Sequence, residues 1–211
     1  MQETATDWTR YYESPFITAL LTRRITARLL VKLISAAGFP DGGRIIEAGG
    51  GNSSFCMPLM HILHASHYLA IDNNPRGVEL FRQKHPGTET ETLCTDLFSL
   101  DAASIEPADL VFSIGLVEHF PEGLTKTAIR RHFELAKPGG LVLVSFPVPT
   151  PCYRLIRGTA ESLGLWRFPD ERPIQLEDAV HLCAEHGDVI AKRLNRAILL
   201  TQGIVLVRKP G

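Results

Sequence analysis

Three acidic side chains close three successive short apolar segments, and this is the pattern in the sequence best suited to chemistry. Glu47 lies at the end of the segment 44–48, Asp72 follows 68–71, and Asp96 ends the weaker segment 90–95. Carboxylates at such positions can attract a cation or accept hydrogen bonds from the hydroxyl and amine groups of a ligand. Three of them in succession point to one shared ligand site.

A glycine turn, Gly49-Gly50-Gly51, follows Glu47 directly. Glycine lets the backbone turn tightly and approach a ligand without interference from a Cβ atom. The third glycine of a dinucleotide fingerprint would fall at Ser54, and Glu47 would repel a pyrophosphate. Glu47 instead suits a ligand that carries an ammonium and a sulfonium group. The turn therefore favours S-adenosylmethionine over a dinucleotide.

Asp72 lies 23 residues after Gly49, with Asn73 beside it in the candidate cofactor site. A carboxylate at this distance can accept hydrogen bonds from both ribose hydroxyls of a nucleoside. The alternative is that Asp72 caps the helix that begins at Pro75.

Asp96 can accept a hydrogen bond from the exocyclic amine of adenine, with Leu97 and Phe98 flanking the ring. The alternative for Asp96 is a solvated turn residue. The coincidence of the three carboxylates carries more weight than any one of them.

Strands that alternate with helices must position these residues. The expected strands are 44–48, 68–71, 90–95, 110–114 and 141–146, with helices at 76–84 and 124–136 between them. Such crossover connections imply a parallel sheet. After a helix at 176–186, the strands 189–194 and 203–207 are too close for a crossover and should be antiparallel. We expect an α/β fold: a doubly wound, mostly parallel seven-stranded sheet with a C-terminal antiparallel hairpin and helices on both faces.

Two further segments complete a single expected domain over residues 1–211. The first is an N-terminal helical segment, 1–40, whose helix should begin with Ser14 as N-cap and Pro15 as first residue. Its apolar residues keep one face apolar: Ile17, Leu20, Leu21, Ile25, Leu29 and Leu33. The second is a cap-like insertion, 147–174, in which prolines interrupt the regular rhythm.

Composition limits the partners. The net charge of −1 gives no field to gather nucleic acid or an anionic membrane, and no apolar run reaches membrane-spanning length. The four cysteines have no paired-thiol metal spacing, and the amino terminus is too polar and acidic for a secretory signal. We expect a cytoplasmic protein with a small-molecule substrate, no nucleic acid and no membrane partner.

Together these motifs resemble the class I, seven-stranded S-adenosylmethionine-dependent methyltransferases. The resemblance extends from Arg44 to Val207 and includes the stretches 47–51, 113–120 and 137–140. It implies that Gly49 and Gly51 border the methionine part of the cofactor, with Gly50 in the same turn. It also implies that Asp72 holds the ribose and that Asp96 with Leu97 frames the adenine. Many relatives have a further glycine where this chain has Ser53.

The residues from Ile114 and Gly115 to His119 would, by the same resemblance, line the methyl-transfer site. Glu118 and His119 are similar to a small-molecule subgroup that includes quinone-pathway O-methyltransferases. Some of those relatives bind a divalent metal with a further acidic residue three positions before the glutamate. That position is Gly115 here, so we expect no metal. The series His61, His64 and His67 lacks carboxylate partners and is expected to be packed or solvated.

The expected function is in-line methyl transfer from adenosylmethionine to an O or N atom of a small molecule. His119 is the best candidate for a base, because an unperturbed imidazole titrates near neutrality; the alternative is a structural histidine. Acceptor contacts are expected from Glu118 and from aromatic residues before the first helix and in the insertion: Tyr11, Tyr12, Tyr153 and Trp166. A non-catalytic adenosylmethionine-binding module is the main alternative, and a nicotinamide-dependent oxidoreductase is a weaker one.

Overall fold

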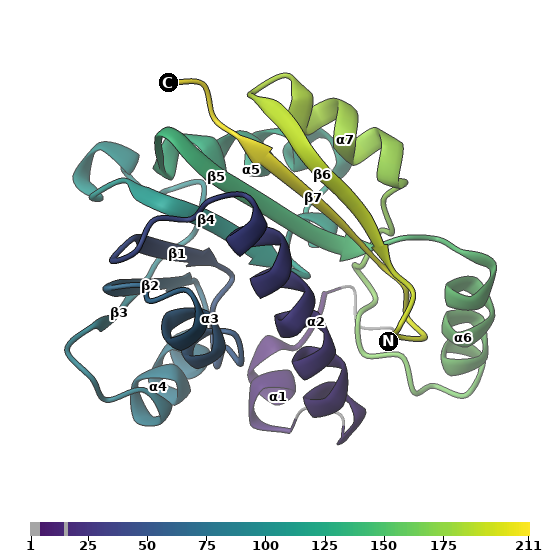
Figure 1. The fold of residues 1–211 in the computed structure, drawn as a ribbon. Helices are drawn as coiled ribbons and strands as arrows, with labels where there is room; N and C mark the ends of the chain where they lie inside the picture. Colours follow the sequence, from purple (N-terminus) through teal and green to yellow (C-terminus); the bar gives the residue numbers. More distant parts are fainter. Residues whose placement is uncertain (1–4, 15–16) are drawn as a thin grey trace.

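The computed structural model describes residues 5–14 and 17–211. Its sheet has seven strands in the order β3-β2-β1-β4-β5-β7-β6 (Figure 1). The strands are β1 (Arg44–Ala48), β2 (His67–Asp72), β3 (Thr90–Cys94), β4 (Ala108–Ile114), β5 (Ala136–Pro147), β6 (Asp188–Asn195) and β7 (Gln202–Arg208). Strands β1 to β5 pair in parallel, and β7 runs antiparallel to β5 and β6. The predicted mostly parallel sheet with its antiparallel hairpin is confirmed.

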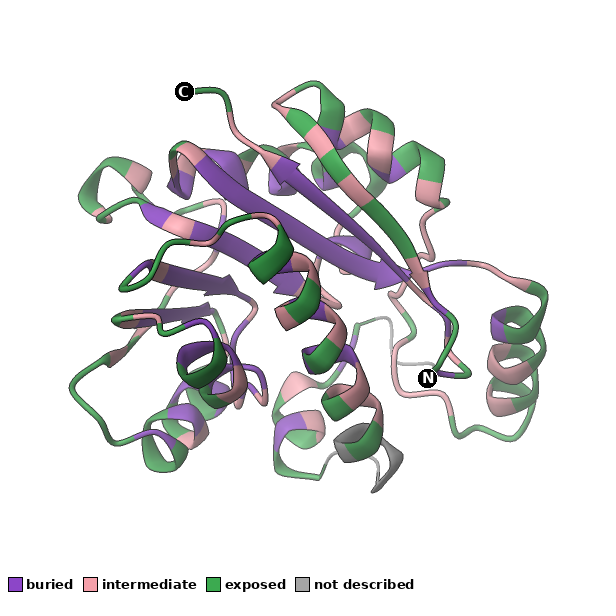
Figure 2. Cartoon of the chain, viewed as in Figure 1, coloured by how far each residue is buried: buried purple, intermediate pink, exposed green. Residues whose placement is uncertain are grey.

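Helices cover both faces of the sheet. They are α1 (Trp8–Glu13), α2 (Ile17–Ala36), α3 (Cys56–Ile62), α4 (Pro75–Lys84), α5 (Glu122–Leu135), α6 (Pro151–Ser162) and α7 (Leu176–Ala184), with short 3-10 turns η1 (Ala102–Ser104) and η2 (Val117–His119). Helices α2, α3 and α4 contribute to the core on one face, and α5 and α7 to the core on the other. Both faces of the central strands are therefore buried (Figure 2).

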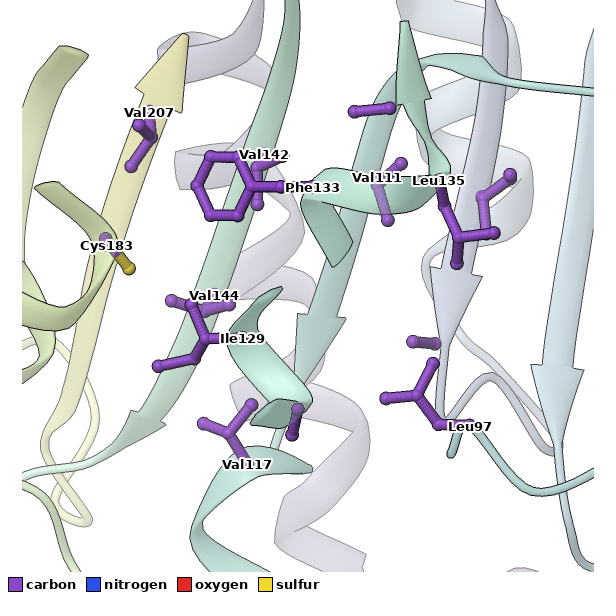
Figure 3. Packing of buried hydrophobic residues seen from close by; sticks show 14 of the residues in the cluster. Leu97, Val111, Val117, Ile129, Phe133, Leu135, Val142, Val144, Cys183 and Val207 are labelled. Carbon is purple, nitrogen blue, oxygen red and sulfur yellow. The ribbon is translucent and has the colours of Figure 1, made fainter. Parts of the chain in front are cut away.

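Successive side chains of a strand point to opposite faces of the sheet, so each central strand contributes to both cores. In β1, Ile45 packs with the α2–α3–α4 side, whereas its neighbour Ile46 packs with the α5–α7 side. Figure 3 shows the second core, where Phe133 of α5 lies beside Val142 of β5 and Ile129 of α5 lies beside Val144 of β5. Burying one such side chain contributes roughly 2 kcal/mol. Packing of the two cores holds the sheet in place, and the sheet in turn sets the positions of the carboxyl ends of its strands.

The aromatic residues expected before the first helix form a helix themselves. Asp7 caps α1 by accepting a hydrogen bond from the Arg10 backbone N–H at 3.0 Å, so Trp8, Tyr11 and Tyr12 lie within the helix. The expectation that these aromatic residues precede the first helix is therefore wrong.

The predicted helix start at Ser14 and Pro15 falls partly outside the described residues, since Pro15 is not described and Ser14 ends α1.

Helix α2 packs on the core through Leu29 and Leu33 of the predicted apolar face, which are partly buried, and through a neighbouring set of residues that is more deeply buried. Its buried apolar residues are Ala27, Leu30 and Ile34, whereas Leu21 is 65% exposed. Leu21 and Ile25 instead line a cavity at the carboxyl ends of the strands. The side chains of Ile17 and Leu20 lie outside the described ones.

The insertion 147–174 is more regular than its prolines indicate, because it contains α6. Thr150 caps this helix by accepting from the Tyr153 backbone N–H at 3.2 Å, and Pro151 is its first residue. Proline at that position favours a helix start, since its missing N–H would have no partner there. Among the described residues, no helix combines the length and apolar character needed to cross a bilayer.

Candidate functional site

A cavity of about 830 Å³ opens at the carboxyl ends of the parallel strands. This volume lies in the range of small-molecule sites, roughly 300–1,000 Å³. Its walls come from the glycine turn, the ends of β2, β3 and β4, helices α1, α2 and α6, and the β6–β7 loop. It brings together all the predicted site residues except Gly50: Glu47, Gly49, Gly51, Asp72, Asn73, Asp96, Leu97, Ile114, Gly115, Tyr11, Tyr12, Glu118, His119, Tyr153 and Trp166.

Two residues of the turn, Gly49 and Gly51, have conformations or surroundings that disfavour any residue with a Cβ atom. Gly49 has φ of +74°, the left-handed region that glycine adopts readily. At Gly51, a Cβ atom would lie only 2.8 Å from the Asp72 Oδ2 atom and from the Tyr12 ring. Gly50 faces the strands instead, where a Cβ atom would meet Ala70 at 3.0 Å. The turn therefore presents bare backbone to the cavity.

Asp72 is buried beneath this turn. Its Oδ2 atom accepts hydrogen bonds from the Gly51 backbone N–H and the Tyr12 hydroxyl, both at 2.8 Å. Its Oδ1 atom accepts from the Asn74 backbone N–H at 2.8 Å. Asn74, not Asp72, caps α4. A carboxylate has about four acceptor positions, so Oδ1 retains capacity for a ligand hydroxyl.

Asp96 holds the turn after β3 and also lines the cavity. Its carboxylate accepts from the backbone N–H groups of Phe98 at 2.8 Å and Ser99 at 3.3 Å, which holds the turn after β3. Asp96 also lines the cavity together with the buried Leu97. The turn thus orients a carboxylate and an apolar side chain toward the same space.

Glu47 is a buried carboxyl at the junction of the turn and β1. The Tyr68 hydroxyl donates a hydrogen bond to its Oε2 atom. Burial raises the pKa of Glu47 to about 7, because hydrogen bonds from Ser53 and Tyr68 offset only part of the desolvation of the charged form. A nearby cation would therefore favour the ionised form of Glu47.

His119 forms a pair with Asp170, a residue of the insertion. The imidazole Nδ1 atom lies 3.1 Å from the Asp170 Oδ1 atom, and the Thr6 hydroxyl donates to the same oxygen. Burial lowers the pKa of His119, although Asp170 opposes the shift, and this favours the neutral ring. A neutral ring that donates from Nδ1 to a carboxylate keeps the Nε2 lone pair available. This is the arrangement of a general base with an orienting carboxylate.

Two glutamates adjoin this pair and, with Asp170, form what we call the acidic pocket: Glu118, Asp170 and Glu171. Glu118 is only 1% exposed, and its Oε2 atom has no hydrogen-bond partner within the described part of the chain. Burial raises the pKa of Glu118 well above its usual range and also raises that of Glu171. One ligand atom each of Glu118, His119 and Glu171 lies within 4.8 Å of the others, a grouping able to hold a cation.

Tyr153 and Trp166, both predicted from sequence, support the acidic pocket from the insertion. The Tyr153 hydroxyl donates to the Glu171 carboxylate, and Arg157 lies 3.1 Å from the Tyr153 hydroxyl oxygen. The Arg157 guanidinium also stacks over the Trp166 ring at 5.3 Å. These contacts fix Glu171 in place.

Asp170 and Glu171 are the site residues that sequence reasoning missed. They lie between Pro169 and Pro173 in a stretch with no helix or strand periodicity. Two adjacent acids were the one local signal, and their partner His119 is 51 residues away.

The outer wall of the cavity is apolar. Three leucines from separate segments line it while remaining largely exposed: Leu21 of α2 at 65%, Leu165 after α6 at 61% and Leu199 of the β6–β7 loop at 73%. Exposed apolar side chains that converge on a cavity commonly mark a binding surface. The histidines of the series 61–67 do not line this cavity in the described structure, and His67 lies 3.4 Å from Glu91.

Comparisons with known proteins agree with this geometry. A family model described as a methyltransferase domain matches residues 45–140. No curated protein matches the sequence. The fold is similar to magnesium protoporphyrin IX methyltransferase from Synechocystis with bound S-adenosylhomocysteine (TM-score 0.74, 17% identity, 96% of this chain and 92% of that one).

Two further solved structures share the fold. One is the N-methyltransferase NodS from Bradyrhizobium japonicum with S-adenosylhomocysteine (TM-score 0.67, 17% identity, 96% of this chain and 91% of that one). The other is a putative methyltransferase from Haloferax volcanii in complex with a methyltransferase activator (TM-score 0.76, 10% identity, 99% of this chain and 100% of that one).

Proposed function

We propose that this chain, whose residues 45–140 match a methyltransferase domain, uses S-adenosylmethionine to methylate a small molecule at an oxygen or nitrogen atom beside His119. The observation that carries the proposal is the His119–Asp170 pair, which adjoins the predicted cofactor residues within one cavity. A binding module that only senses adenosylmethionine would not need an imidazole oriented by a half-buried carboxylate.

Adenosylmethionine supplies an activated methyl group on a sulfonium. The chain's own residues bind and orient the reactants. Bare backbone at Gly49 and Gly51 admits the methionine part, Asp72 accepts from a ribose hydroxyl, and Asp96 with Leu97 receives the adenine. Holding both reactants in line contributes several kcal/mol, since effective molarities of oriented reactants correspond to about 7–11 kcal/mol.

His119 accepts the proton that the acceptor atom loses. Asp170 is a positioning residue: it fixes the Nδ1–H tautomer and stabilises the imidazolium that forms. The acceptor has an apolar body, because the wall beyond His119 is made of aromatic and aliphatic side chains such as Trp166, Phe168 and Leu199.

The proposal takes residues 1–211 as one methyltransferase domain. Within it, the helical segment 1–40 and the cap-like insertion 147–174 are the two walls of the acceptor cavity. The free thiols of the four cysteines fit a reducing, cytoplasmic location.

The test is turnover with a panel of phenols, carboxylic acids and amines, measured as adenosylhomocysteine formed. His119→Ala should lower kcat by about 10²–10⁴, the usual contribution of a general base, and leave adenosylhomocysteine affinity unchanged. Asp170→Asn should lower kcat less and alter the acid limb of the pH profile, while the exposed His61→Ala serves as a control. Unchanged turnover of His119→Ala at every pH would remove it from the mechanism.

A further inference from the structure

Glu118 presents an unsatisfied buried oxygen beside the methyl-transfer position. Its Oε2 atom has no hydrogen-bond partner among the described residues, although the side chain is 1% exposed. Leaving such a group unpaired costs free energy that a ligand with a matching donor would recover. Glu118 lines the cavity, so a bound acceptor can reach it.

The surroundings of Glu118 favour a cationic donor over a neutral one. Glu171 and Asp170 are the other carboxyls of the acidic pocket, and the negative charge of each raises the pKa of Glu118. Arg157 lies 3.7 Å from Glu171, and no comparable cation is paired with Glu118 in the described ion pairs. A positive ligand would relieve this repulsion.

The spacing of the acceptor atoms suits one nitrogen. One atom each of Glu118, His119 and Glu171 lies within 4.8 Å of the others. An amine nitrogen at hydrogen-bond distance, about 2.8 Å, from tetrahedrally placed acceptors separates them by about 4.6 Å. A single ammonium can therefore contact all three groups without rearranging the pocket.

We propose, resting on the function proposed above, that the acceptor is an amine with an apolar body, and that Glu118, Glu171 and His119 hold its nitrogen. The apolar body lies along the wall that ends at Leu21, Leu165 and Leu199. Glu118 is thus a specificity-determining residue that selects an amine over an alcohol of the same shape.

The chemistry balances with groups already named. The bound ammonium gives one proton to the Nε2 atom of His119 and becomes a neutral amine with a lone pair. Once the neutral amine has turned away from the imidazolium, that lone pair forms the new N–C bond as the S–C bond breaks, and the electron pair of the S–C bond stays on sulfur. The sulfonium becomes a neutral thioether, and the nitrogen becomes a methylated ammonium.

The test is calorimetric binding of 4-phenylbutylamine and its neutral counterpart 4-phenylbutan-1-ol to the full chain saturated with adenosylhomocysteine. The amine should bind wild-type protein about tenfold more tightly or better, the gain of a charge-assisted hydrogen bond. Glu118→Gln should remove this preference, because the amide cannot carry negative charge. Glu122→Gln, the same change on an exposed residue nearby, should keep it.

Equal affinity for the amine and the alcohol in wild-type protein would overturn the proposal, as would an amine preference that survives Glu118→Gln. Magnesium or manganese binding that is lost in Glu118→Gln, without an amine preference, would reassign the pocket to a metal. Thermal melting with adenosylhomocysteine shows whether Glu118→Gln is folded, and Glu118→Asp supplies a variant that keeps the charge. Turnover of a hydroxyl acceptor without an amine preference would retain the proposed function and refute only the amine.

Discussion

Binding of adenosylmethionine should release protons from Glu47. Burial raises the pKa of this carboxyl to about 7, so in the empty protein it is about half protonated at pH 7. Glu47 lines the cavity at the glycine turn, where the cationic groups of the ligand are expected. A nearby positive charge favours the ionised carboxylate, which then gives up its proton to the buffer.

The size of the effect follows from the pKa. If Glu47 is fully ionised in the complex, binding releases about 0.9 proton at pH 6, 0.5 at pH 7 and 0.1 at pH 8. Because release of protons makes binding tighter as the pH rises, affinity should increase about tenfold from pH 6 to pH 8. The shift from 4.5 to about 7 corresponds to roughly 3 kcal/mol, which the cation must largely offset.

Calorimetry at each pH in two buffers of different ionisation enthalpy measures the protons released. Glu47→Gln, which resembles the protonated carboxyl, should abolish the release that belongs to this residue. Protons that come from the ligand's own amino group remain in the variant and cancel in the difference. The reasoning is refuted if wild-type protein and Glu47→Gln release equal numbers of protons at pH 6.

Two other predictions concern stability and the glycine turn. Burial lowers the pKa of His132 from 6.5 to about 4. The contribution of neutral His132 to the free energy of unfolding is therefore fully present above pH 6.5 and is lost as the pH falls toward 4. Urea unfolding should show a loss of about 3 kcal/mol between pH 7 and pH 4 from this residue, and an equal loss in His132→Leu would contradict the assignment. Gly51→Ala places a Cβ atom 2.8 Å from the Asp72 Oδ2 atom and the Tyr12 ring, so adenosylhomocysteine should bind more than about tenfold more weakly. Gly87→Ala, with nothing within 4 Å of its Cβ, is the matched control, and equal affinities of the two variants would count against a close-packed turn.

The parts of the fold that sequence could predict are those determined by local patterns. Strands β1, β2 and β3 are short segments with an acidic residue at or close to the carboxyl end. Because parallel strands place their carboxyl ends at one edge of the sheet, the sequence alone assigns Glu47, Asp72 and Asp96 to one site. This assignment needs only the local pattern of each strand and the geometry of a parallel sheet.

The parts that sequence could not predict depend on contacts between distant segments. Helix α1 has only six residues, too few for a periodic pattern, and it is held by the Asp7 cap and by the Tyr12 hydroxyl on Asp72. Asp170 pairs with His119 across 51 residues. On α2, Leu21 of the predicted apolar stripe lines the cavity, whereas Leu29 and Leu33 of the same stripe pack against the core. An apolar stripe shows that a face avoids water, and it does not show which neighbour covers it.

The two buried glutamates connect the cofactor end of the cavity to the acceptor end. Glu47 lies in β1 and Glu118 follows β4, and these strands are neighbours in the sheet. Burial raises the pKa of both carboxyls, so each end favours the arrival of positive charge. In the proposed reaction the positive charge leaves the sulfonium at the Glu47 end and appears on the methylated nitrogen at the Glu118 end. The two carboxyls therefore stabilise reactant and product in turn. Substitution of Glu47 should weaken the binding of adenosylmethionine more than that of adenosylhomocysteine, because adenosylhomocysteine lacks the sulfonium charge.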